Sequence, residues 1–181
     1  MAKKKTKKKQ TSNNSQINIH CKYDKLEPLN KLKPHPANPN RHPEGQIELL
    51  AKIIKEHGIR WPISISKKSD YIISGHGRLM AAQKLELKTY PVVYQDFKSE
   101  SEELAVLVAD NKIAELAEID GSKMGDIIVE LDQVNYPLEF TALSEQEIAY
   151  YVEGPTYKPD GESYDENIET KNQCPKCGYE W

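Results

Sequence analysis

The segment YIISGHGRLMAA, at residues 71–82, constrains the fold more than any other part of this sequence. A short apolar run suited to a β-strand leads into a Gly-His-Gly turn, and a helix-forming run follows. Glycines permit a sharp turn and bring the backbone close to a ligand, while the free N–H groups of a first helical turn suit a phosphate. The segment therefore predicts a phosphate site formed by Ser74, Gly75, His76, Gly77 and Arg78.

Two side chains of this turn suit the same ligand. The guanidinium of Arg78 is permanently charged and can hold a phosphate through two hydrogen bonds. His76 can donate a further one. The alternative is a plain connection in which the glycines only permit the bend. The segment lacks both the Gly-Lys-Ser/Thr of the Walker pattern and the third glycine of the Rossmann fingerprint.

The hydrophobic pattern of the remaining chain predicts a small α+β domain with a helical C-terminal extension. Apolar runs of strand length stand at residues 17–23, 62–66, 71–74 and 90–94. Helical periodicity and helix-start residues predict helices at residues 44–57, 78–86, 99–119, 124–134 and 144–153. Residues 26–43 are dense in Pro and Asn, which favours an ordered extended loop.

The two ends of the chain differ from this core in composition. Residues 1–16 are polar and of low complexity, so we expect a disordered basic arm. The predicted organisation continues with the α+β domain at 17–120, the helical extension at 121–153, an acidic linker at 154–172 and the CPKCGYEW terminus at 173–181.

The lysine-rich arm predicts contact with nucleic acid. Six of the first ten residues are lysine and none is acidic, whereas the rest of the chain holds 19 Lys and Arg against 28 Asp and Glu. A basic arm on an acidic body is typical of proteins that contact DNA or RNA through a tail, although such an arm can also be only a solubilising terminus. The expected DNA-binding residues are Lys3, Lys4, Lys5, Lys7, Lys8 and Lys9.

The cysteines predict a metal site rather than disulfides. Cys174 and Cys177 form a CxxC followed by glycine, which is the shape of a zinc knuckle that supplies two of four ligands. The missing ligands can come from another subunit, from a partner, or from Cys21 with a histidine; a redox dithiol and a vestigial half-site are the alternatives. The odd cysteine count and the lack of a long apolar run predict a cytoplasmic protein without a membrane segment.

Several of these motifs together resemble the N-terminal domain of ParB, a family that shares its fold with sulfiredoxin. The resemblance covers residues 17–120. It is carried by the LKPHPANPNR run at residues 32–41, a helix ending in Gly58, Pro62-Ile63, the SGHGR turn at residues 74–78, Ala81-Ala82 and the PVV run at residues 91–93.

The resemblance implies a nucleoside triphosphate with Mg²⁺ as ligand. Nucleotide-binding members would hold it between the SGHGR turn and the opposite loop, here Asn38 and Arg41. Asp110-Asn111 also matches short members of the family, where both would face the nucleotide or the metal; the preferred alternative is a solvated helix face. The chain has Gly-His-Gly-Arg where partition proteins carry Gly-Glu-Arg-Arg, and His76 replaces the cysteine that sulfiredoxin needs. Without that thiol we expect no sulfiredoxin activity. The family's long helix-turn-helix DNA-reading domain has no room here, so the chain looks like a short phage- or mobile-element-type member.

The function we expect is a nucleotide-binding, DNA-associated accessory protein, with mainly non-specific DNA contact and a homodimer among its candidate assemblies. One alternative is an enzyme on the same fold, a nuclease, NTPase or kinase. A second is an adaptor that recruits a DNA methyltransferase or another phage protein.

Overall fold

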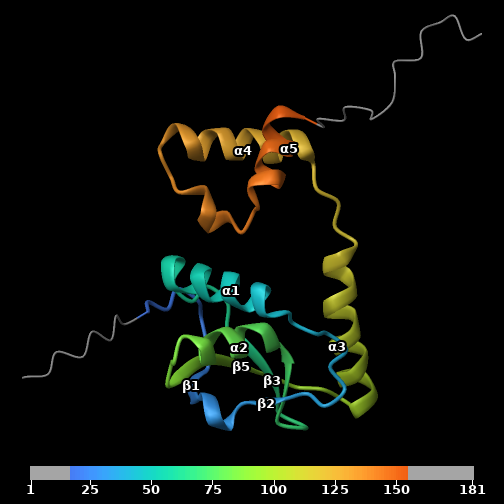
Figure 1. Ribbon diagram of the computed structural model, residues 1–181. Helices are drawn as coiled ribbons and strands as arrows, with labels where there is room; N and C mark the ends of the chain where they lie inside the picture. Colours follow the sequence, from blue (N-terminus) through green and yellow to red (C-terminus); the bar gives the residue numbers. More distant parts are fainter. Residues whose placement is uncertain (1–16, 155–181) are drawn as a thin grey trace, which may run out of the picture.

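The computed structural model describes residues 17–154, so the lysine arm and the cysteines Cys174 and Cys177 lie outside the described residues. Figure 1 shows a mixed sheet covered by helices on one face, with a second helical unit above them. The mixed α and β content expected from the sequence is confirmed. No helix among residues 17–154 is long and apolar enough to cross a membrane.

The sheet has five strands in the order β1-β5-β3-β4-β2 and combines antiparallel with parallel pairs. The pairs β1–β5 and β3–β4 are antiparallel, whereas β3–β5 and β2–β4 are parallel. The strands are β1 (Lys25–Pro28), β2 (Lys33–Pro34), β3 (Ile63–Ser66), β4 (Tyr71–Ser74) and β5 (Thr89–Gln95).

Two helices, α1 (Glu44–His57) and α2 (His76–Lys84), pack on each other on one side of the sheet (Figure 1). The buried face of α1 carries Ile47, Ala51 and Ile54, as its periodicity predicts. A short 3-10 turn, η1 (Leu29–Lys31), adds Leu29 to the same core. Both β4 and α2 contribute side chains to this core, so the glycine turn joins two elements that are each held by packing.

The strand predicted at residues 17–23 is wrong. Only Ile19 forms a bridge there, with Ile59, and the first true strand is β1. Most of β1 and the whole of β2 lie in residues 26–43, the segment predicted to be a loop. The free edge of β5 decides the outcome, because the Asp24 amide donates to the Val92 carbonyl and begins the β1–β5 ladder. Alternation of apolar and polar side chains indicates that a segment can form a strand. It does not indicate which edge of the sheet is free to pair with that segment.

Three helices follow β5, of which the first packs against β4 and the last two pack on each other beyond it. Helix α3 (Glu100–Glu115) runs along one side of the molecule in Figure 1 and ends earlier than the predicted residue 119. It leads to α4 (Gly121–Gln133), the 3-10 turn η2 (Leu138–Thr141) and α5 (Glu145–Glu153). Helices α4 and α5 pack on each other, and η2 contacts α1, where the Nε2 atom of His57 lies 3.0 Å from the Phe140 carbonyl oxygen.

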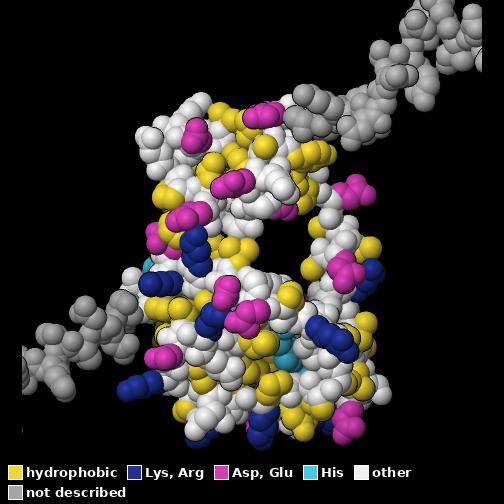
Figure 2. Space-filling view, in the orientation of Figure 1, with side chains coloured by type: hydrophobic (Ala, Val, Ile, Leu, Met, Phe, Trp, Pro, Cys, Tyr) yellow, Lys and Arg dark blue, Asp and Glu magenta, His cyan; other side chains and the backbone are white. Residues whose placement is uncertain are grey.

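Charge divides between these two parts of the structure. Residues 17–98 hold 14 Lys and Arg against 8 Asp and Glu, whereas residues 99–154 hold 2 against 14. In Figure 2 most of the basic side chains lie on the α/β domain, together with some acidic ones, whereas the charged side chains of the helices above it are mainly acidic. Among the described residues, the excess of acidic side chains therefore lies on the helices after β5. The α/β domain itself has a net positive charge.

Candidate functional site

A cavity of about 300 Å³ lies where the glycine turn, the loop before α1 and helix α3 meet. Seven of the eight residues predicted for the phosphate site line it, and Arg41 does not, since its exposed side chain lies outside the lining. The residues that line the cavity are Asn38, Asn40, His42, Leu50, Trp61, Ile73, Ser74, Gly75, His76, Gly77, Arg78, Asp110 and Asn111.

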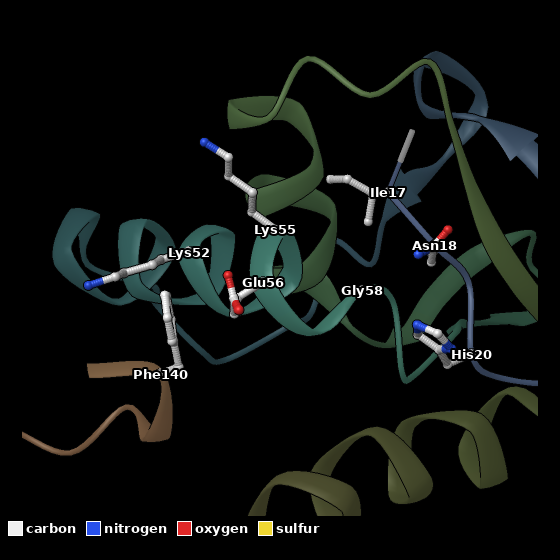
Figure 3. Close-up of a pocket in the computed structure, with 8 residues that line it drawn as sticks. All are labelled: Ile17, Asn18, His20, Lys52, Lys55, Glu56, Gly58 and Phe140. Carbon is white, nitrogen blue, oxygen red and sulfur yellow. The ribbon is translucent and has the colours of Figure 1, made fainter. Parts of the chain in front are cut away.

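A larger cavity, of about 430 Å³, lies at the C-terminal end of α1 (Figure 3). Lys52 and Lys55 border it, but Lys52 is already paired with Glu139 and lies over the Phe140 ring. The C-terminal end of a helix carries partial negative charge, which disfavours an anionic ligand. The smaller cavity at the start of α2 is therefore the better phosphate site.

Gly75 lets α2 begin directly after β4. Its φ of +104° lies in the region that favours glycine, and the first helical hydrogen bond runs from the Leu79 amide to the Gly75 carbonyl at 3.0 Å. The helix thus begins at His76, two residues before the predicted start. As a result the amides of His76, Gly77 and Arg78 belong to the first turn, where the helix itself does not use them.

Replacing Gly75 with alanine is expected to lower the free energy of unfolding by about 1–3 kcal/mol. An added Cβ would lie 2.9 Å from Arg78 Nε and 3.1 Å from Ile63, on a backbone that alanine adopts with strain. Urea unfolding measures the change. Gly45→Ala is the matched control, since a Cβ there meets nothing within 4 Å; equal stability of the two variants would contradict the strained turn.

Arg78 brings a partly buried positive charge to the cavity. Burial lowers the pKa of its guanidinium, and the neighbouring Tyr90 and Asp110 offset part of this effect, so the side chain stays charged. Its Nη2 donates to Ser74 Oγ at 3.2 Å, which holds the guanidinium at the turn. A charge held in this way beside unused amides suits an anion.

His76 contributes a neutral donor. Burial lowers the pKa of its imidazole to about 4, with smaller contributions from His42 and His35. Its Nε2 accepts a hydrogen bond from the His35 amide at 3.1 Å, so the proton of the neutral ring resides on Nδ1. The ring therefore has an N–H to offer a ligand without carrying charge.

Stability is expected to fall through His76 as the pH drops from 7 towards 4. The unfolded chain titrates near pH 6.5, so in this window it binds a proton that the folded chain does not. The contribution is fully present above that range and is lost as the pH falls towards about 4. Urea unfolding at pH 7 and at pH 5 should show a smaller loss for His76→Gln than for the wild type; equal losses would contradict the assignment.

Helix α3 supplies the opposite wall through Asp110 and Asn111. Asn40 Nδ2 donates to Asn111 Oδ1 at 2.8 Å and joins the loop before α1 to the helix. Mg²⁺ takes oxygen ligands, a few from the protein and the rest from phosphates and water, so the carboxylate and amide oxygens here fit a metal shared with a nucleotide. Among residues 17–154 no cluster of three or more His, Cys, Asp or Glu residues could hold a metal.

Sequence patterns did not identify five further residues that line the cavity, of which Asn40 has been described. Leu50 lies on α1, Ile73 on β4 and Trp61 in the connection between α1 and β3, and each reaches the cavity only through the fold. His42 lies before α1 and contacts Gln46 through Nδ1 at 3.0 Å. The dense Pro and Asn content around His42 was the one sequence signal that marked its loop as ordered.

Comparison with known proteins bears on this arrangement. Residues 6–117 match the family described as the ParB N-terminal domain. The ParB-like nuclease domain-containing protein YnaK of Escherichia coli (strain K12) is 39% identical over 66 residues, which cover 36% of this chain and 75% of that protein.

Solved structures with a similar fold include a chromosome-partitioning protein. The C-terminally truncated chromosome-partitioning protein ParB from Caulobacter crescentus, complexed with CTP-γ-S, is 22% identical, with 71% of this chain and 76% of that chain covered and a TM-score of 0.59. Sulfiredoxin from Arabidopsis thaliana is 25% identical, with 46% of this chain and 93% of that chain covered and a TM-score of 0.37. The family match, which spans more than half of the sequence, shows that this chain belongs to the ParB N-terminal domain family.

Proposed function

We propose that this chain binds a nucleoside triphosphate in the cavity at the start of α2. The observation that carries the proposal is the meeting of the glycine turn, Arg78 and the α3 pair Asp110 and Asn111 around one cavity of about 300 Å³. CTP is the first candidate, because the similar Caulobacter crescentus ParB was crystallised with CTP-γ-S.

The proposed binding mode follows from the groups around the cavity. The first-turn amides of α2 and the Arg78 guanidinium would hold the phosphates, with the Nδ1–H of His76 as a neutral donor. Asp110 and Asn111 would hold Mg²⁺, which supplies charge neutralisation between phosphate oxygens when bound. The exposed Trp61 ring offers an apolar surface for the base.

We propose that the chain binds the nucleoside triphosphate without hydrolysing it. Asp110 is the one carboxylate among the residues that line the cavity in the described part of the chain. A side chain that acts as a general base must lie within hydrogen-bond reach of the attacking water, and Asp110 is already assigned to the metal in the proposed binding mode.

The biological role we propose is that of a DNA-associated accessory protein of phage or mobile-element type in the cytoplasm. The lysine arm, outside the described residues, would contact DNA without sequence preference. Recruitment of a DNA-modifying enzyme and assembly into a homodimer are parts of the same proposal.

Zinc is expected at about half to one atom per chain, bound by Cys174 and Cys177, which lie outside the described residues. Half an atom would indicate a site shared by two chains. Elemental analysis of protein purified without a metal-affinity tag measures the content. Absence of zinc, or zinc retained in Cys177→Ser, would refute the knuckle.

Calorimetric titration of the full chain with CTP, ATP, GTP and UTP, each in Mg²⁺ and in EDTA, tests the nucleotide proposal. One nucleotide should bind with a measurable heat and with higher affinity in Mg²⁺. The same titration with a duplex oligonucleotide present shows whether DNA changes the affinity. No binding of any nucleotide under either condition would end the proposal.

A further inference from the structure

A buried polar cluster joins α3 to the β3–β4 hairpin, outside the nucleotide cavity. Its centre is the carboxylate of Glu103, which is only 3% exposed. Ser66 Oγ donates to one carboxylate oxygen at 2.5 Å, and Ser69 Oγ donates to the other at 2.5 Å. His35 Nε2 lies 3.4 Å from the oxygen that Ser69 contacts.

The charge at this position is maintained by its neighbours. Burial on its own would raise the pKa of the Glu103 carboxyl, but the hydrogen bonds from Ser66 and Ser69, together with His35, outweigh it and lower the pKa. An apolar side chain would anchor a helix at this place without the cost of burying a charge. The carboxylate adds a defined orientation of the helix, because its two hydrogen bonds and its contact with His35 each require a particular geometry.

Glu103 shares a helix face with the residues that reach the cavity. Glu103 and Leu107 are the two buried side chains of α3, and Asn111 follows four residues later on the same face. Asn111 also donates through Nδ2 to the Leu107 carbonyl at 3.0 Å. The placement of Asn111 two turns along therefore depends on how α3 is anchored at Glu103.

His35 extends this anchor to the glycine turn. Its amide donates to His76 Nε2 at 3.1 Å, while its ring faces the Glu103 carboxylate. The ring is fixed further by Nδ1, which accepts from the Ala37 amide at 3.1 Å. One residue thus contacts both the turn that would hold phosphate and the helix that would hold metal.

We infer that Glu103 is a positioning residue for nucleotide binding, which sets the α3 face bearing Asp110 and Asn111 against the glycine turn. The inference rests on the proposed nucleotide site. It assigns a division of labour: the turn and Arg78 supply the affinity that needs no metal, and the Glu103 cluster governs the part that depends on Mg²⁺.

Glu103→Gln tests the inference, because the amide keeps the shape of the side chain but lacks the charge and accepts at one oxygen only. CTP is titrated calorimetrically in Mg²⁺ and in EDTA. The wild type should bind about tenfold more tightly or better in Mg²⁺ than in EDTA, and Glu103→Gln should lose most of this gain while its affinity in EDTA stays within about twofold of the wild type.

Two further variants keep the test decisive. Glu100→Gln, an exposed carboxylate one turn earlier on α3, should retain the full Mg²⁺ gain. Ser69→Ala, which removes one donor and keeps the carboxylate, should show a partial loss and replaces Glu103→Gln if that variant does not fold. A full Mg²⁺ gain in Glu103→Gln, or equal weakening with and without metal, would overturn the positioning role. No CTP binding by the wild type would remove the CTP site as well.

Discussion

Replacing Arg78 with alanine is expected to weaken nucleotide binding at least tenfold, about 1.4 kcal/mol of binding free energy. The guanidinium is partly buried at the cavity, is held by Ser74 and lies beside the first-turn amides of α2. Its removal takes away the permanent charge that would face the phosphates. Calorimetric titration with CTP, ATP and GTP measures the loss.

Arg60→Ala is the matched control for this variant. The Arg60 side chain is exposed and donates to the His57 carbonyl at 3.1 Å, and it does not line the cavity. It should bind nucleotide as the wild type does. Circular dichroism should show that both variants keep the fold. Unchanged affinity in Arg78→Ala would place the phosphate site elsewhere.

Removal of the lysine arm is expected to weaken duplex DNA binding at least about tenfold near physiological salt. If about four of the six lysines neutralise phosphates, the logarithm of the binding constant should fall against the logarithm of salt with a slope near −3.6. A chain that starts at Ile17 should show a much shallower slope. Fluorescence anisotropy over a salt series, with duplex and single-stranded oligonucleotides, gives both quantities.

A full-length variant with Gln at all six lysine positions separates charge from length. It should behave as the truncated chain does, because the phosphate contacts are electrostatic. The α/β domain keeps its own excess of 14 Lys and Arg over 8 Asp and Glu, so some residual binding is expected. If both variants bind duplex DNA with wild-type affinity and slope, the arm is only a solubilising tail.

The glycine turn could be predicted because its signal is local. An apolar strand, two glycines and a helix-forming run stand next to one another in the sequence, and the fold brings them together without distant partners. The start of α2 at His76 was missed for a related reason. A glycine in the left-handed region can end a strand and begin a helix in one residue, and a hydrophobic pattern does not show this.

The opposite wall of the cavity could not be derived from pattern alone. Asn40 and Asn111 are 71 positions apart and meet through a hydrogen bond. From the sequence alone, a solvated helix face is the preferred interpretation of Asp110 and Asn111. The Glu103 cluster is similar, since Ser66 and Ser69 stand 37 and 34 residues away from it. Such contacts depend on the packing of α3 against β4, which no local signal specifies.

The most direct test of the nucleotide site is a titration of isotope-labelled protein with CTP and Mg²⁺, followed through backbone amide resonances. The largest shifts should fall on Gly75, His76, Gly77 and Arg78, with Asn111 shifting only when Mg²⁺ is present. Shifts concentrated instead around Lys52, Gly58 and Phe140, the cavity of Figure 3, or no shifts at all, would contradict the site.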